Sequence, residues 1–129
     1  MKLALITDAW RPQINGVVTT LSTVAERLGA FGHEVETVTP DQFRNWPCPT
    51  YPEIRLALGC GDGLRRRLDR LRPAAIHIAT EGPLGLAARA YCRRRGRPFT
   101  SSFHTLFAEF VTVRTGLPLS WGYRFLAWF

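Results

Sequence analysis

The sequence has no long apolar run, few cysteines and almost no lysine. No stretch approaches the roughly 18 apolar residues of a membrane-spanning helix, and the run at residues 3–6 is too short for a signal-peptide core. The 3 cysteines, Cys48, Cys60 and Cys92, have no C-x-x-C spacing, which argues against a zinc knuckle and a disulfide framework. We therefore expect a soluble protein of the reducing cytoplasm.

Several catalytic motifs are also missing. The sequence contains no G-x-x-x-x-G-K-[ST] phosphate loop, no G-x-S-x-G nucleophile elbow and no H-E-x-x-H pair. Residues 59–64 approach a dinucleotide fingerprint, but Leu64 stands where its third glycine belongs, so a turn capped by Asp62 is the better interpretation. Phosphate-loop ATPases, serine hydrolases and zinc proteases are excluded, and we expect no metal and no resident cofactor.

Positive charge is in excess. The 129 residues include 17 Lys+Arg against 10 Asp+Glu, a formal net charge of +7, and all the basic residues except Lys2 are arginine. Nucleic acid, anionic lipid and phosphate-bearing small molecules are therefore candidate partners. Two arginine runs fall on predicted helices: Arg65, Arg66, Arg67, Arg70 and Arg72 on one, and residues 93–95 with Arg97 on the other. No base-stacking aromatics are interleaved with them, so the runs are either solvated faces or contacts with anionic membrane.

The hydrophobic pattern alternates strands with helices. It predicts strands at residues 3–6, 33–39, 53–58, 74–79 and 99–103. Helical spacing predicts a first helix through Leu21, Val24, Ala25, Leu28 and Phe31, a second from Asp62 that Pro73 ends, and a third around residues 86–95. This order predicts an α/β fold, a Rossmann-like doubly wound parallel sheet.

The C-terminal residues carry a stripe of aromatic side chains. Trp121, Phe125, Trp128 and Phe129 recur at helical spacing and reach the last residue without a helix cap. Such a stripe needs something to cover it. We therefore expect residues 1–129 to be one domain of a longer protein.

Polar residues follow the predicted strands, where ligands of parallel α/β sheets bind. Gly16 opens the first helix, where backbone N–H groups can reach an anion, unless Asn15 and Gly16 only form a tight turn. His104 either donates to a phosphate or sugar hydroxyl or caps the following helix. His33 and His77 lie beside or within strands, which favours structural roles.

Taken together, these segments resemble the N-terminal domain of Glycosyltransferase Family 4. The resemblance covers the chain in order and rests on residues 3–8 with Pro12, 15–18 (Asn-Gly-Val-Val), 32–35 (Gly-His-Glu-Val), 51–55 (Tyr-Pro-Glu-Ile-Arg), 80–85 (Thr-Glu-Gly-Pro-Leu-Gly) and 101–105 (Ser-Ser-Phe-His-Thr). Many members carry Gly-Gly where this chain has Asn15 and Gly16. The sequence is most similar to the branch of lipid α-mannosyltransferases and sulfoquinovosyl-diacylglycerol synthases.

The resemblance implies the N-terminal half of a retaining transferase of the GT-B fold, which passes a sugar from a nucleotide-sugar, such as GDP-mannose or a UDP-sugar, to a lipid or glycan acceptor. It implies that the backbone at Gly16 and Val17 meets the donor diphosphate and that His104 is catalytic, reaching the transferred sugar or its phosphate. Asp8, Asn15 and Glu81 would line the acceptor side. The family's C-terminal nucleotide-binding domain lies outside these 129 residues, so we expect them to be inactive alone.

A lipid acceptor would place the protein on the inner face of the plasma membrane. Arg65, Arg66, Arg67 and Arg70 are the expected membrane contact. The alternative is a non-catalytic Rossmann-like module that binds anionic membrane or nucleic acid through these helices. A second α/β domain with a Glu-x₇-Glu pair encoded beyond Phe129 would favour the enzyme.

Overall fold

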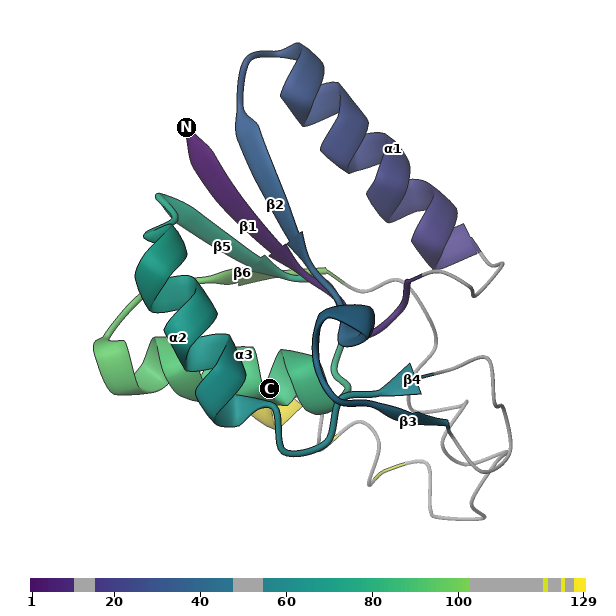
Figure 1. Cartoon of the computed structure of the whole chain (residues 1–129), viewed down its shortest axis with the longest axis vertical. Coiled ribbons are helices and arrows are strands. Elements are labelled where there is room, and N and C mark those ends of the chain that lie inside the picture. The colour runs from purple at the N-terminus through teal and green to yellow at the C-terminus, as the bar shows by residue number, and fades with distance from the viewer. Residues whose placement is uncertain (11–15, 48–54, 103–119, 121–123, 125–126) are drawn as a thin grey trace.

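The computed structural model describes residues 1–10, 16–47, 55–102, 120, 124 and 127–129. Of the residues singled out above, Pro12, Asn15, Cys48, His104, Trp121 and Phe125 lie outside this set. The described elements follow one another along the chain (Figure 1): β1 (Lys2–Ile6), α1 (Gly16–Ala30), β2 (Glu34–Val38), the 3-10 helix η1 (Pro40–Gln42), β3 (Trp46–Pro47), β4 (Arg55–Leu56), α2 (Gly61–Leu71), β5 (Ala75–Ile78), α3 (Pro83–Arg95) and β6 (Thr100–Ser101).

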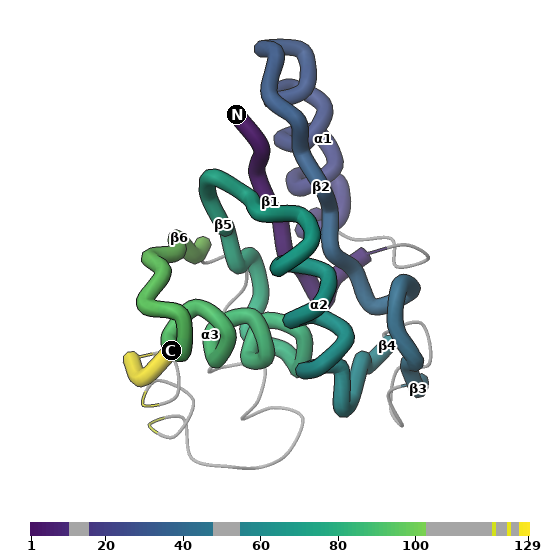
Figure 2. Tube along the Cα trace, turned by 60° about the vertical axis from the view of Figure 1, so that its left-hand side comes forward, coloured from purple at the N-terminus to yellow at the C-terminus, as the bar shows by residue number. Residues whose placement is uncertain are grey.

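Four strands form one parallel sheet in the order β2-β1-β5-β6. Helix α1 covers one face of this sheet, while α2 and α3 pack together on the other face (Figures 1 and 2). Helices on both faces of a parallel sheet define the doubly wound arrangement. The predicted α/β fold with a Rossmann-like sheet, as in the N-terminal half of a GT-B enzyme, is confirmed.

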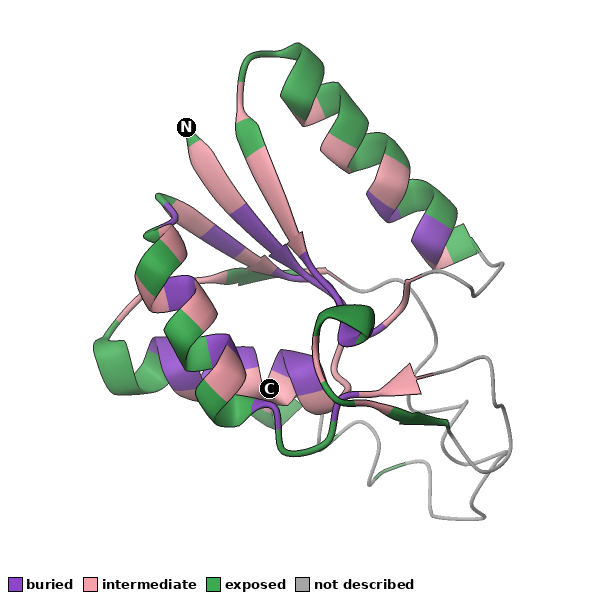
Figure 3. Cartoon of the chain, in the orientation of Figure 1, coloured by how far each residue is buried: buried purple, intermediate pink, exposed green. Residues whose placement is uncertain are grey.

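The main core lies between the sheet and the pair α2 and α3, as the buried residues in Figure 3 show. Leu64 and Leu68 are fully buried, which is the outcome of an apolar stripe at i, i+4 spacing. Helix α1 buries a smaller share of its apolar side chains than α2 and α3 do. Leu21 is buried as predicted, but Val24 is 41% exposed and Phe31, beyond the helix, is 76% exposed. Since α1 lies over the edge strand β2, its later turns have little sheet beneath them.

Two local predictions are wrong. The strand predicted at residues 53–58 is present as β4, but it pairs antiparallel with β3 in a separate ribbon instead of joining the parallel sheet, and β3 itself lies in a segment predicted as loop. The apolar pattern predicts where a strand lies but not which strand it pairs with. Asp62 does not cap α2 either. Cys60 occupies the N-cap position without a side-chain cap bond, and Asp62 lies in the first turn, where its charge complements the helix dipole.

The two helices on this face end differently. Helix α3 ends at Gly96 with φ of 61°, the left-handed conformation that glycine adopts without strain. Helix α2 ends at Arg72 with φ of 49°, and Arg72 is the only non-glycine residue with positive φ among the described residues. A side chain in this conformation costs about 1 kcal/mol.

The last residues of the chain contact α3. The buried Arg89 donates from Nε to the Phe129 carbonyl at 3.2 Å and from Nη2 to the Trp128 carbonyl at 2.9 Å. Its guanidinium also lies 3.8 Å from the centre of the Trp128 ring. Phe129 packs against the main core, which covers this end of the aromatic stripe, whereas Trp128 remains 57% exposed. Among the described residues, no helix is long and apolar enough to cross a membrane.

The first turn of α3 packs directly on the end of β5. A Cβ atom added to the buried Gly85 would overlap the carbonyl oxygen of Thr80, whereas one added to Gly29 in α1 would meet nothing within 4 Å. We expect Gly85→Ala to lower the free energy of unfolding by about 2 kcal/mol or more, because a backbone atom must move. Gly29→Ala, the matched control, should raise it by roughly 0.5 to 1 kcal/mol. Urea unfolding of the two variants checks this, and equal stabilities would contradict the close packing.

Candidate functional site

Asp8 and Thr80 stand side by side beyond the carboxyl ends of β1 and β5. The register pairs Ile6 of β1 with Ile78 of β5. Asp8 comes two positions after Ile6, and Thr80 comes two positions after Ile78. From β1 the chain continues through α1 to β2, and from β5 it continues through α3 to β6, on opposite sides of the sheet. This point of reversal is where doubly wound sheets bind ligands.

The Asp8 side chain joins the two loops. Its Oδ1 accepts a hydrogen bond from the Leu84 amide at 2.7 Å, and its Oδ2 accepts from the Gly85 amide at 3.1 Å and from the Thr80 hydroxyl at 2.7 Å. The Asp8 amide donates back to the Thr80 hydroxyl at 2.7 Å. Gly82, the N-cap of α3, has no side chain to cap the helix. Asp8 therefore caps α3 from a distant part of the chain.

Burial and the charge of Asp8 shift the pKa values of the ionisable groups at this edge. Burial raises the pKa of Asp8, against the opposing effect of the hydrogen bonds from Thr80, Leu84 and Gly85. Burial and then the Asp8 charge raise the pKa of the half-buried Glu81. The same two causes raise the pKa of the Cys60 thiol, which lies at the start of α2. The carboxyl ends of β1 and β5 thus carry two neighbouring carboxyl groups, and Glu81 holds its proton more readily than an exposed glutamate.

The N-terminus of α1 lies at the same edge of the sheet. Gly16 is its first residue, is exposed and has space around its Cα, since an added Cβ would meet nothing within 4 Å. The Val17 side chain packs against the core on the α1 face, so only its backbone is placed to meet a ligand. Helix α1 has no acidic residue in its first turn, whereas α2 has Asp62 and Asp8 caps α3. The first turn of α1 therefore has no acidic side chain of its own to complement the helix dipole.

The predicted membrane face on α2 is partly neutralised. Arg66 and Arg70 are exposed, but Arg65 lies 4.0 Å from Asp62 and 3.8 Å from Asp69. Arg67 turns toward β2 and pairs with Glu36 at 3.7 Å. Exposed pairs of this kind contribute little to stability.

His104 and Asn15 lie outside the described residues, so their predicted places at this edge stay predictions. Sequence reasoning missed the bonds from Asp8 to Thr80 and Gly85. One signal could have found them: an Asp and a Thr at equal distances after two strands that are neighbours in the sheet. Among the residues that the structure describes, no three His, Cys, Asp or Glu side chains gather into a metal-binding group.

A doubly wound sheet with polar side chains gathered at its switch point defines a Rossmann-like ligand-binding domain. The family model for Glycosyltransferase Family 4 matches residues 14–129, which is most of the chain. The chain belongs to this family.

Curated relatives point to the same branch that the motifs predicted. The chain is 29% identical over 126 residues to alpha-monoglucosyldiacylglycerol synthase of Acholeplasma laidlawii, a match that covers 86% of this chain and 31% of the relative. It is 28% identical over 129 residues to the GDP-mannose-dependent alpha-mannosyltransferase of Mycolicibacterium smegmatis, covering 86% and 34%. The chain thus spans about a third of the length of these relatives. No solved structure gives a significant match.

Replacing Glu81 tests the electrostatics of the site. Because the folded pKa of Glu81 is raised above its ordinary 4.5, folding favours the protonated form, and ionisation costs stability as pH rises through the folded pKa. Glu81→Gln is always neutral, so it should melt at a higher temperature than the wild type at pH 8, and the difference should shrink toward pH 4. Glu26→Gln, at an exposed position on α1, is the control for the loss of a carboxyl group from the surface. A Glu81→Gln effect that is independent of pH would contradict the argument.

Proposed function

We propose that the chain is the acceptor-side half of a retaining, nucleotide-sugar-dependent glycosyltransferase that passes a sugar to a lipid or glycan acceptor. Family membership and relatives whose names specify diacylglycerol glycolipid synthesis and GDP-mannose-dependent transfer support this proposal. A non-catalytic binding module gains no support, since the curated relatives that match this chain are named as synthases or transferases. A second domain, beyond these residues, would hold the nucleotide.

The observation that carries the proposal is the exposed start of α1 at the switch point of the sheet. Its first turn has no acidic residue, and Gly16 lacks a Cβ that would hold a ligand away from the backbone. Backbone N–H groups and the positive end of a helix dipole bind phosphate oxygens at such a start. We assign the donor diphosphate to the backbone of Gly16 and Val17.

The acceptor would lie beside the carboxyl groups of the neighbouring loops. Glu81 is half-buried next to Asp8, and a carboxyl there can accept a hydrogen bond from an acceptor hydroxyl. Since Asp8 is committed to Thr80 and α3, its contribution is to hold the Glu81 loop in place. Asn15 completes this side in the proposal.

The chemistry requires positioning more than a protein nucleophile. The donor phosphate would assist removal of the acceptor proton as the sugar is transferred, while the protein orients both substrates and stabilises the departing diphosphate. We assign His104 to the transferred sugar or its phosphate, as a hydrogen-bond donor to the charge that develops. No metal or resident cofactor enters this scheme.

Two substitutions in the complete enzyme test these roles. Gly16→Val should abolish transfer with the fold intact, because a branched side chain blocks the approach of a diphosphate to the backbone. The control is Gly29→Val in the same helix, where space is also open, and it should retain activity. Full activity of Gly16→Val would refute the diphosphate assignment.

His104→Ala should lower kcat by about 100-fold, the loss expected when one donor to developing charge is removed.

We also propose that the exposed arginines of α2 hold the enzyme on an anionic membrane at the cytoplasmic face. Leu64 and Leu68 are buried in the core, so the opposite side of α2 is free for a surface contact. Each arginine near an anionic bilayer contributes about 1 kcal/mol, screened over about 10 Å at moderate salt. Salt should therefore weaken the binding.

Vesicle co-sedimentation checks the membrane contact. The complete enzyme should bind anionic vesicles at low salt, release them at high salt and ignore neutral vesicles. The triple variant Arg65→Gln, Arg66→Gln, Arg67→Gln should lose most of this binding. The triple variant Arg27→Gln, Arg93→Gln, Arg94→Gln removes equal charge from other exposed sites and should lose less. Equal losses in the two variants would reduce the α2 arginines to a solvated face.

A further inference from the structure

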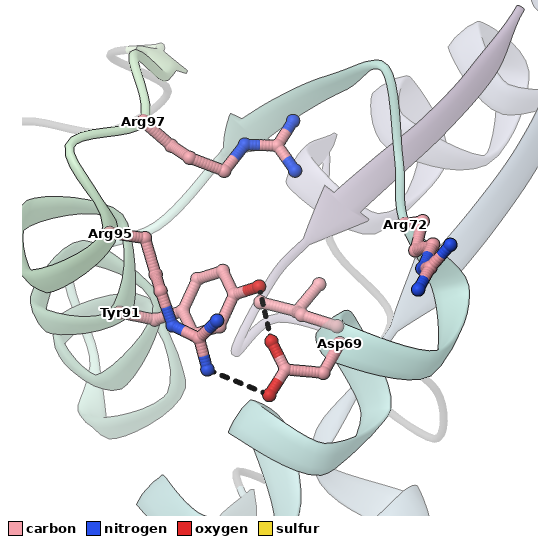
Figure 4. A pocket seen from close by; sticks show the side chains of 6 residues that line it. Asp69, Arg72, Tyr91, Arg95 and Arg97 are labelled. Carbon is pink, nitrogen blue, oxygen red and sulfur yellow. Dashed lines mark hydrogen bonds and ion pairs between the residues drawn. The ribbon is translucent and has the colours of Figure 1, made fainter.

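An arginine-lined depression of about 470 Å³ lies between the C-terminal ends of α2 and α3 (Figure 4). Its lining residues are Leu68, Asp69, Arg72, Tyr91, Arg95 and Arg97. Arg72 comes shortly before β5, and Arg97 shortly before β6. The depression therefore lies at the amino edge of the sheet, opposite the edge that carries Asp8 and Glu81.

The one acidic group in the lining is already paired. Asp69 Oδ1 accepts from the Tyr91 hydroxyl at 2.9 Å, and Asp69 Oδ2 accepts from Arg95 Nη2 at 2.8 Å (Figure 4). Arg65 lies 3.8 Å from the same oxygen. The carboxylate of Asp69 is thus balanced by Arg95, so the charges of Arg72 and Arg97 are left uncompensated within the lining.

Arg97 is held in place by the protein backbone. Its Nη2 donates to the Pro73 carbonyl at 2.6 Å, which fixes the guanidinium beside the turn that leads from α2 into β5. A guanidinium has five N–H donors, so four remain for another acceptor. Complementing a helix dipole accounts for Arg95 in the last turn of α3, but Arg97 lies beyond the end of that helix.

Arg72 occupies a position where glycine would be expected. Its φ of 49° strains a side chain, and the neighbouring α3 has Gly96 at the equivalent place. Its guanidinium is exposed and makes no hydrogen bond or ion pair with another described residue. A strained residue at the rim of a cavity is a sign that its side chain has a use there.

We propose that this depression binds a phosphate group between Arg72 and Arg97. Each guanidinium presents a planar fork of donors that matches two phosphate oxygens. The volume exceeds that of one phosphate ion, so it also accommodates a phosphate with an attached group. The phosphate is either free in solution or the headgroup of a phospholipid. The inference does not rest on the proposed transfer reaction, since it concerns binding at the opposite edge of the sheet.

Thermal unfolding of the full chain in sodium phosphate and in sodium chloride of equal ionic strength tests the proposal. Inorganic phosphate should raise Tm in a saturable way, by roughly 5 °C at ten times its Kd. The double variant Arg72→Gln, Arg97→Gln should lose this shift. The control Arg27→Gln, Arg93→Gln removes equal charge from exposed positions outside the depression and should keep it.

Arg72→Gly covers the case in which the double variant does not fold. Relief of the positive φ should raise its Tm in chloride, while its Kd for inorganic phosphate, from isothermal titration, should rise at least tenfold. Higher stability together with lost binding separates a ligand contact from a structural role. An unchanged Kd would overturn the proposal.

Vesicles distinguish the two sources of phosphate. If the ligand is a headgroup, the double variant Arg72→Gln, Arg97→Gln should bind phosphatidylglycerol vesicles more weakly than the control variant does, and excess inorganic phosphate should compete. If the ligand is free phosphate, the two variants should bind vesicles equally while the phosphate shift is still lost. Equal Tm in phosphate and chloride, combined with equal vesicle binding by both variants, would show that the arginines form a solvated surface only.

Discussion

The hydrogen bonds of the Asp8 carboxylate hold the carboxyl edge of the sheet together. They join the loop after β1 to Thr80 and to the first turn of α3, across more than 70 residues of sequence. Pro83 has no N–H, and the Leu86 amide bonds to the Gly82 carbonyl, so Asp8 satisfies the two amides of this turn that would otherwise be unpaired. The position of Glu81, directly before this turn, therefore depends on Asp8.

The helix N-termini at this edge differ in the negative charge that meets them. The carboxylate of Asp8 already meets the positive end of the α3 dipole, and Asp62 lies in the first turn of α2. An anion would compete with these side chains at either helix. The first turn of α1 has no acidic residue of its own, and Gly16 places no side chain over its backbone. In the proposed function, the donor diphosphate would therefore meet α1 rather than α3, whose start Asp8 already caps.

The sequence predicts where most of the strands and helices lie, β4 and β6 included, and misses β3 and the local contacts and pairings. Strands β1, β2 and β5 and the buried face of α2 follow from apolar runs and from Leu64 and Leu68 at i, i+4, because burial imposes that spacing. The β3 and β4 ribbon and the positive φ of Arg72 have no such spacing. The bonds of Asp8 depend on which strands become neighbours, which only the assembled sheet decides.

Negative and positive charges lie at opposite ends of the helices, and therefore at opposite edges of the sheet. The last turns of α1, α2 and α3 carry arginine, while carboxylates meet the first turns of α2 and α3. Each placement complements a helix dipole, so stability alone favours it. The result is an acidic cluster at the carboxyl edge, beside the proposed acceptor, and an excess of guanidinium groups at the amino edge. Arg72 and Arg97 exceed what the dipoles require, since one adopts a strained conformation and the other lies outside a helix, and these two residues give the amino edge its capacity to bind an anion.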